Sequence, residues 1–238
     1  WGNHQAVVTL VKQIANREGI GDLLAEGVKR ASAKVGKGSE HFAMHVKGLE
    51  ACGYDARGVQ TFALGCAVGT RGPCHNRSLA YEADIKGEVD RLKAGPERGA
   101  LAKKAEEFAA VFDTVMLCKF IRACFKDIWT EIPELYKYAT GIELTPEEFK
   151  LAMERSWNLK KAFNIREGWK KEDDWLPPRW LEDQLPSGGS KGAYVKPDDL
   201  RMMLQSYYEA RGWTPDGLIP KAKLIALGLE DIAEDIGV

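Results

Sequence analysis

Phe112-Asp113-Thr114-Val115-Met116-Leu117-Cys118-Lys119-Phe120 is the stretch around which this chain is organised, because an acid stands five residues before a cysteine in a largely apolar run. The apolar spacing predicts that the run lies within a helix over residues 101–125. In such a helix Asp113 and Cys118 are about 7.5 Å apart along the axis and about 140° apart around it, so they face different neighbours. Either Cys118 is a buried free thiol beside a capping Asp113, or Asp113 hydrogen-bonds a cofactor while Cys118 binds a neighbouring metal centre.

The composition is that of an ordinary globular protein, with 238 residues, 45% hydrophobic residues, 29% charged residues and a net charge of −1. It gives no electrostatic reason to expect nucleic-acid binding, and no apolar run is long enough to predict a membrane span. The odd number of cysteines, without a secretory signal, favours a reducing, cytoplasmic compartment. No CxxC pair is present, so the sequence predicts no self-contained zinc or iron–sulfur motif. The cysteines are Cys52, Cys66, Cys74, Cys118 and Cys124.

Apolar periodicity predicts a mainly α fold, since strand signals are weak throughout the chain. Thr145-Pro146-Glu147-Glu148 is typical of a capped helix start, and the helix that follows presents Phe149, Met153 and Trp157 at a spacing of four. Asp22 is expected to cap a helix after the break at residues 19–22. The expected helices are 4–18, 23–35, 61–70, 101–125, 133–140, 146 to about 163, 197–210 and 220–227.

Several segments are predicted to be irregular. Residues 41–60 form an ordered loop, whose charged side chains belong either to a solvated turn or to a functional site. Residues 86–100 are expected to be an exposed excursion, and the chain becomes loop-like from Asn164. In that last region Asp173 and Asp174 are interpreted as surface ion-pair partners rather than metal ligands. The charged residues of the first loop are Lys47, Glu50, Asp55 and Arg57.

The turn at residues 71–78 carries candidate functional side chains directly after a segment of small apolar residues. Arg71 and Arg77 present forked donors that suit anionic groups. His75 is a candidate proton donor or acceptor near neutral pH, although a structural histidine in a turn is the alternative. Cys66 and Cys74 have no partner at ligand spacing and are interpreted as unligated.

Taken together, several motifs resemble the C-terminal half of the aldehyde ferredoxin oxidoreductase family. These are tungsten or molybdenum enzymes with a paired pterin cofactor and a [4Fe–4S] cluster. Any one motif is weak, but their order and spacing are specific, and they cover most of the chain. The motifs are Arg17-Glu18-Gly19, Leu24-Ala25-Glu26-Gly27-Val28, Met44-His45-Val46-Lys47-Gly48-Leu49-Glu50, Tyr54-Asp55-Ala56-Arg57-Gly58, Arg71-Gly72-Pro73-Cys74-His75, residues 113–120, Asn164-Ile165-Arg166-Glu167-Gly168 and Tyr207-Tyr208-Glu209-Ala210-Arg211-Gly212-Trp213.

The resemblance implies a role for each matching residue. Asp113 corresponds to the acid of the second pterin-binding motif, and Cys118 to the fourth cluster ligand, remote in sequence from the other three. His75 corresponds to a histidine facing the substrate pocket, and Arg77 to a basic position near the pterin phosphates. The implied cofactor-binding residues are Asp113, Leu117, Arg77 and Arg71.

The resemblance also implies that a partner region is missing. The family's N-terminal pterin-binding domain, first pterin motif and three clustered cysteines have no counterpart here, and the chain opens without Met. We therefore expect a fragment or split subunit, in which residues 1–45 finish the family's second domain and residues 46–238 form its third. The pterin and the cluster are expected only together with the missing N-terminal part. A homodimer is a candidate quaternary structure.

The implied reaction is oxidation of an aldehyde to a carboxylic acid, with ferredoxin as electron acceptor. One alternative is the catalytic subunit of a related aryl-CoA (benzoyl-CoA) reductase, which acts on an aryl-CoA. Another is a non-catalytic helical module that has lost the cofactor. The presence of Asp113, His75 and Cys118 counts against that last alternative.

Overall fold

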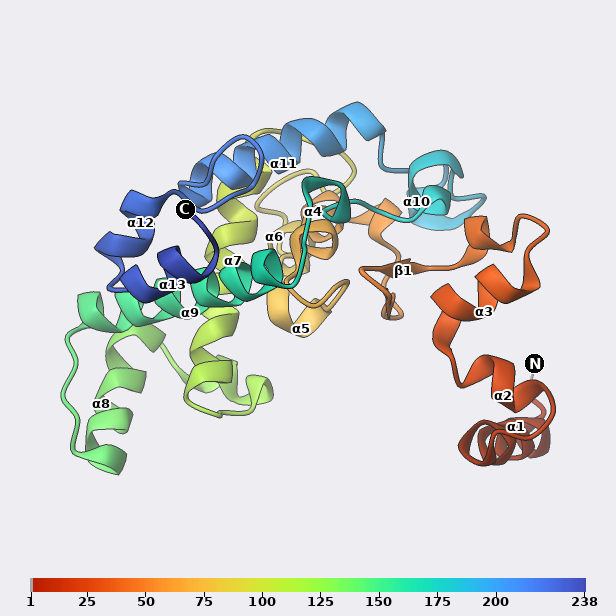
Figure 1. The fold of residues 1–238 in the computed structure, drawn as a ribbon, viewed down its shortest axis with the longest axis horizontal. Helices are drawn as coiled ribbons and strands as arrows, with labels where there is room; N and C mark the ends of the chain where they lie inside the picture. The colour runs from red at the N-terminus through yellow and green to blue at the C-terminus, as the bar shows by residue number, and fades with distance from the viewer. Residues whose placement is uncertain (1) are drawn as a thin grey trace.

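The computed structural model describes residues 2–238 and confirms the mainly α fold (Figure 1). The only sheet in that part of the chain is a two-stranded antiparallel ribbon that pairs Val46 with Leu49. No helix within residues 2–238 has the length and apolarity needed to cross a membrane. The elements are α1 His4–Asn16, α2 Ile20–Leu24, α3 Gly27–Val35, η1 Ser39–Phe42, β1 His45–Val46, β2 Leu49–Glu50, η2 Ala56–Gly58, α4 Gln60–Val68, α5 His75–Ser78, α6 Tyr81–Ile85, α7 Glu97–Thr114, η3 Lys119–Cys124, α8 Ile128–Thr140, α9 Pro146–Arg166, η4 Lys171–Asp173, α10 Pro178–Glu182, η5 Gly188–Ser190, α11 Pro197–Arg211, α12 Lys221–Ala226 and α13 Glu230–Asp235, where η marks a 3₁₀ helix.

The first three helices lie to one side of the main body, and α1 has no buried residue (Figure 1). The single helix expected over residues 23–35 is wrong, because a turn at residues 25–26 separates α2 from α3, which begins at Gly27 with φ +79°. Asp22 lies inside α2 and pairs with Arg17 at 2.8 Å instead of capping a helix. Most of the break in the pattern at residues 19–22 is therefore part of a short helix, Ile20–Leu24.

The core is built around α4, in which every residue is buried. Helices α7 and α11 pack against α4, α9 packs against α7, and α11 also packs against α7 (Figure 1). Gly99 makes that contact close, since a Cβ atom there would lie 2.3–2.5 Å from the backbone of Ser206 and Tyr207. The structure therefore requires glycine at this crossing, because no side chain fits between the two backbones.

The predicted start of α9 is confirmed. Thr145 and Glu148 form a capping box, and Phe149, Met153 and Trp157 are buried on the core face. The expected start of the preceding helix at residue 133 is wrong, because α8 already begins at Ile128 and holds that proline in its interior. Side chains stabilise the earlier start: an Asp127 oxygen accepts from the Trp129 N–H, and a Glu131 oxygen accepts from the N–H groups of residues 126 and 127.

The central stretch is not a continuous helix, so the helical spacing expected for Asp113 and Cys118 is wrong. Helix α7 ends at Thr114, and Met116 takes a left-handed conformation with φ +57°. The N–H of Leu117 donates to the carbonyl of Phe112 at 2.9 Å, which is the hydrogen bond that closes a Schellman motif at a helix end. Residues 115–118 therefore form an irregular link between α7 and η3.

Several charged side chains predicted to be exposed are buried. Asp174 is 1% exposed and pairs with Lys47 and Lys161, so its assignment to the surface is wrong. A solvated turn is likewise excluded for Arg57, which is buried against Asp55. Within residues 86–100, Arg98 is buried and pairs with the carboxylate of residue 84 at 2.7 Å, so this segment is not simply an exposed excursion.

Candidate cofactor site

Asp113 lies at the end of α7 between two cations from other elements. Its Oδ2 atom is 2.8 Å from Nη1 of Arg77 in α5, and its Oδ1 atom is 2.8 Å from Nζ of Lys119 in η3. The Asp113 side chain is 23% exposed, so it reaches solvent despite both contacts. The structure therefore places Asp113 and Arg77, both predicted site residues, in direct contact, and it adds Lys119, whose role the sequence did not indicate.

Arg71 lines a nearby pocket of about 340 Å³. The side chain of Arg71 is exposed, and its Nη2 atom donates to Sγ of Cys74 at 2.9 Å. Arg77 lines the same pocket from α5, and α9 contributes the opposite wall. The pocket is lined by Thr70, Arg71, Arg77, Leu159, Lys160, Phe163 and Asn164.

His75 is the first residue of α5 and lies half-buried among aromatic side chains. Its ring is tilted against Tyr54 with 5.2 Å between ring centroids, and Tyr54 stacks on Tyr81 at 5.5 Å. Burial, together with the positive charges of Lys119 and Arg71, lowers the pKa of His75 below its usual value. At neutral pH His75 is therefore uncharged and suited to accept a proton.

Cys118 is exposed and lies directly before η3. Phe120, within η3, is 91% exposed. Leu117 is half-buried and packs against the core. Burial raises the pKa of the Cys66 thiol, and Cys74 is also buried. Within the part of the chain that the structure describes, no group of three or more His, Cys, Asp or Glu side chains is arranged to hold a metal ion.

Asp113 and Cys118 fit part of what the implied cofactors need: a hydrogen-bond acceptor for the pterin and one ligand for the cluster. Asp113 is an acceptor held by cations, and its partial exposure leaves room for hydrogen bonds from pterin amines. The exposed thiol of Cys118 fits a single cluster ligand. The described residues do not supply the remaining ligands of a cluster around it.

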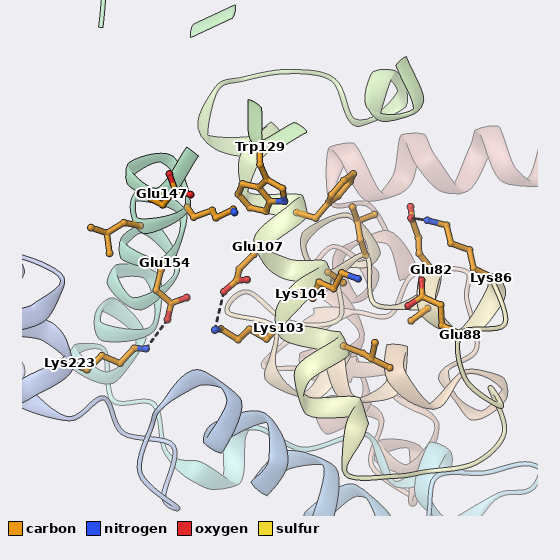
Figure 2. Close-up of a pocket in the computed structure, with 17 residues that line it drawn as sticks. Glu82, Lys86, Glu88, Lys103, Lys104, Glu107, Trp129, Glu147, Glu154 and Lys223 are labelled. Atoms are coloured by element: carbon orange, nitrogen blue, oxygen red, sulfur yellow. Dashed lines mark hydrogen bonds and ion pairs between the residues drawn. The ribbon is translucent and has the colours of Figure 1, made fainter. Parts of the chain in front are cut away.

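A second pocket, with a volume of about 760 Å³, lies between α7 and α9 (Figure 2). None of the site residues predicted from the sequence lines it. Its five lysines and five glutamates balance one another, and Lys103 pairs with Glu107 while Lys223 pairs with Glu154 (Figure 2). The lining thus has no excess of either charge.

Comparison with known proteins decides the family. The family model for "Aldehyde ferredoxin oxidoreductase, domains 2 & 3" matches residues 1–229. The chain belongs to this family. The tungsten-containing aldehyde ferredoxin oxidoreductase of Pyrococcus furiosus is 35% identical over 235 residues, which are 97% of this chain and 38% of that protein. The corresponding enzyme of Thermococcus kodakarensis is 33% identical with the same coverage.

Two further similar proteins have names that state other activities. The aliphatic sulfonate oxidoreductase WOR-like subunit of Pyrococcus furiosus is 29% identical over all of this chain and 35% of that protein. The active-site complex BamBC of benzoyl-coenzyme A reductase is 21% identical, with a TM-score of 0.71 over 99% of this chain and 40% of the matched chain, which shows a shared fold. This member of the aldehyde ferredoxin oxidoreductase family therefore spans less than half the length of its relatives.

Family membership confirms the resemblance drawn from the sequence motifs. It does not test the roles of individual side chains, which stay predictions. These are the roles of His75, Asp113, Leu117, Arg77, Arg71 and Cys118.

Proposed function

We propose that the chain acts as the C-terminal portion of a tungstopterin, iron–sulfur oxidoreductase that oxidises aldehydes to carboxylic acids, with ferredoxin as electron acceptor. The observation that supports this most is the position of Asp113. It is a carboxylate held by Arg77 and Lys119, close in sequence to the exposed thiol of Cys118. The identity with tungsten-containing relatives over nearly the whole chain provides the family context.

In this proposal each side chain has a limited task. Asp113 accepts hydrogen bonds from pterin amines, and Arg71 and Arg77 hold anionic groups of the cofactor. Cys118 provides one thiolate to the cluster, and neutral His75 accepts a proton from the reacting group. When bound, the metal–pterin group supplies the redox chemistry and the cluster transfers electrons. The remaining cluster ligands come from the N-terminal part of the protein.

The wider arrangement is also a proposal. Residues 1–45 complete one family domain and residues 46–238 form the next, in a cytoplasmic protein that contains tungsten or molybdenum. The candidate alternative is the catalytic subunit of an aryl-CoA reductase, favoured by the fold shared with the benzoyl-coenzyme A reductase complex. The intact mass and metal content of the protein from its native source test whether it is an enzyme or a metal-free helical module.

Replacing Asp113 by asparagine should weaken pterin retention by about tenfold or more, because a hydrogen bond to a charged group contributes about 1.5–3 kcal/mol. The amide also replaces a charged acceptor with a neutral acceptor and a donor. The measurement is the pterin-to-protein ratio of the full-length enzyme after gel filtration. Asp216→Asn, which alters an exposed side chain elsewhere, is the matched control. A ratio for Asp113→Asn equal to that of the parent would contradict the role.

A further inference from the structure

Lys119, the first residue of η3, contacts two other elements of the candidate site through its ammonium group. Its Nζ atom lies 2.8 Å from Oδ1 of Asp113 at the end of α7, and it donates to the carbonyl of Asn76 in α5. The Lys119 side chain is only 13% exposed, although it follows the exposed Cys118 directly in the sequence. Lys119 therefore points inward to Asp113, whereas the residue before it faces solvent.

The turn at the end of α7 brings Lys119 back to Asp113. In a continuous helix, residues six apart are separated by about 9 Å along the axis and about 240° around it, so the two side chains would face different directions. Met116, with φ +57°, instead ends the helix, and the N–H of Leu117 closes the turn on the carbonyl of Phe112. The ion pair between Lys119 and Asp113 thus depends on this turn.

Polar contacts hold η3 in place, since none of its residues is fully buried. Arg122 Nε is 2.9 Å from Oε1 of Glu82 in α6, and Arg122 Nη1 donates to the Lys119 carbonyl at 3.0 Å. Ile121 packs partly against the core from the middle of η3. The contacts of Lys119 are therefore the ones that tie the beginning of η3 to α5 and α7.

The chemistry of these contacts suits a fixed geometry. An ammonium group has three donors, so Lys119 can contact a carboxylate and a carbonyl together, and contacts between charged groups are short and strong. Arg77 holds the other oxygen of Asp113 at 2.8 Å, so the carboxylate is fixed from two sides. Consecutive Cα atoms are about 3.8 Å apart, so a fixed Lys119 also restricts the position of Cys118.

We propose that Lys119 is a positioning residue, whose contact with Asp113 sets the place of the Cys118 thiol relative to the carboxylate before either cofactor group binds. The inference rests on the proposed function for the roles of Asp113 and Cys118. It goes beyond that function because Lys119 binds neither the pterin nor the cluster, and acts through the residues that do. Without Lys119 the segment that carries the thiol is held less firmly, so iron bound to it is lost more readily.

The test is the rate at which the full-length enzyme loses iron to an excess of an iron chelator under anaerobic conditions. We expect Lys119→Met to lose iron about tenfold or more faster than the parent, because contacts that orient metal ligands typically contribute that much. Lys119→Gln, a milder change, should also lose iron faster, and Lys119→Arg, which keeps the positive charge, should stay close to the parent. Lys126→Met, which removes an exposed lysine two residues beyond η3, is the matched control. Urea midpoints equal to that of the parent show that the effect is local.

The proposal is overturned if both uncharged variants of Lys119 lose iron no faster than Lys126→Met, or if Lys119→Arg loses it as fast as they do. Cys118→Ser separates this inference from the proposed function. Parental iron content in Cys118→Ser would contradict the proposed function. Loss of iron in Cys118→Ser, together with parental resistance to the chelator in Lys119→Met, would contradict only the positioning role.

Discussion

Replacing Asp174 by alanine is expected to lower the free energy of unfolding by about 3–5 kcal/mol, because two buried ammonium groups lose their shared counter-ion. Asp174 Oδ1 is 2.8 Å from Nζ of Lys47, and Oδ2 is 3.4 Å from Nζ of Lys161. Both lysine side chains are at most 13% exposed. The Tyr208 hydroxyl and the Trp169 indole N–H also donate to this carboxylate, at 2.9 Å and 3.0 Å.

The protonation equilibria give this prediction a pH dependence. Burial opposes ionisation of Asp174, but Lys47 and Lys161 outweigh it and hold the pKa of Asp174 below its usual value. Its stabilising contribution is therefore fully present above the unfolded-state pKa of about 3.9, and is lost as the pH falls through the lower folded-state pKa. Burial, together with the positive charge of Lys47, lowers the pKa of Lys161 to about 7, despite the opposing effect of Asp174.

Urea unfolding at pH 7 measures the predicted effect. Asp216→Ala is the matched control, because Asp216 pairs with Lys171 at 3.3 Å in an exposed ion pair, and it should change the unfolding free energy by only about 0–1 kcal/mol. Adding Lys161→Met to Asp174→Ala should recover part of the lost stability, since it removes one uncompensated buried charge. Equal stability of Asp174→Ala and Asp216→Ala would show that this network does not stabilise the fold.

Replacing His75 by alanine in the full-length enzyme should lower turnover by about 10²-fold or more, while pterin and metal content remain unchanged. His75 is neutral because burial, Lys119 and Arg71 lower its pKa, so it is prepared to accept a proton at physiological pH. The turnover of the parent should accordingly rise with pH as His75 loses its proton.

His41→Ala is the control for this experiment, because His41 lies beside Glu182 and Asp183, away from the candidate site. It should leave turnover unchanged. Turnover of His75→Ala at the parental level, with normal metal loading, would show that the histidine has only a structural role in its aromatic cluster.

Local signals in the sequence predicted the presence of helices better than the residues at which the helices end. The capping box at Thr145 and the apolar face that begins at Phe149 depend only on residues close together in the sequence. The start of α9 was therefore predicted correctly. The end of α7 was missed, because the left-handed position after the helix is held by Met116 rather than by the glycine that usually marks it. The helix-like apolar spacing continues past that residue although the helix does not.

The buried charges and the extra cations of the site depend on partners that are distant in sequence. Asp174 is surrounded by charged and turn-forming residues in the sequence, and only the fold brings Lys47 and Lys161 to it. Asp113 and Arg77 were recognised through motifs, and the structure places them in contact. Lys119 lies within the motif of residues 113–120 but was given no role there, and Lys160 lies in no motif. Their positions, beside Asp113 and at the pocket, were therefore visible only in three dimensions.

Anaerobic reconstitution of the 238-residue chain with iron and sulfide tests whether this chain supplies Cys118 as one ligand of a cluster that is completed elsewhere. A [4Fe–4S] cluster needs four ligands, usually thiolates. In the described residues no metal-holding group surrounds Cys118. We predict an iron content far below four per chain and no cluster absorbance in the visible spectrum. About four irons per chain, lost on Cys118→Ser, would contradict it.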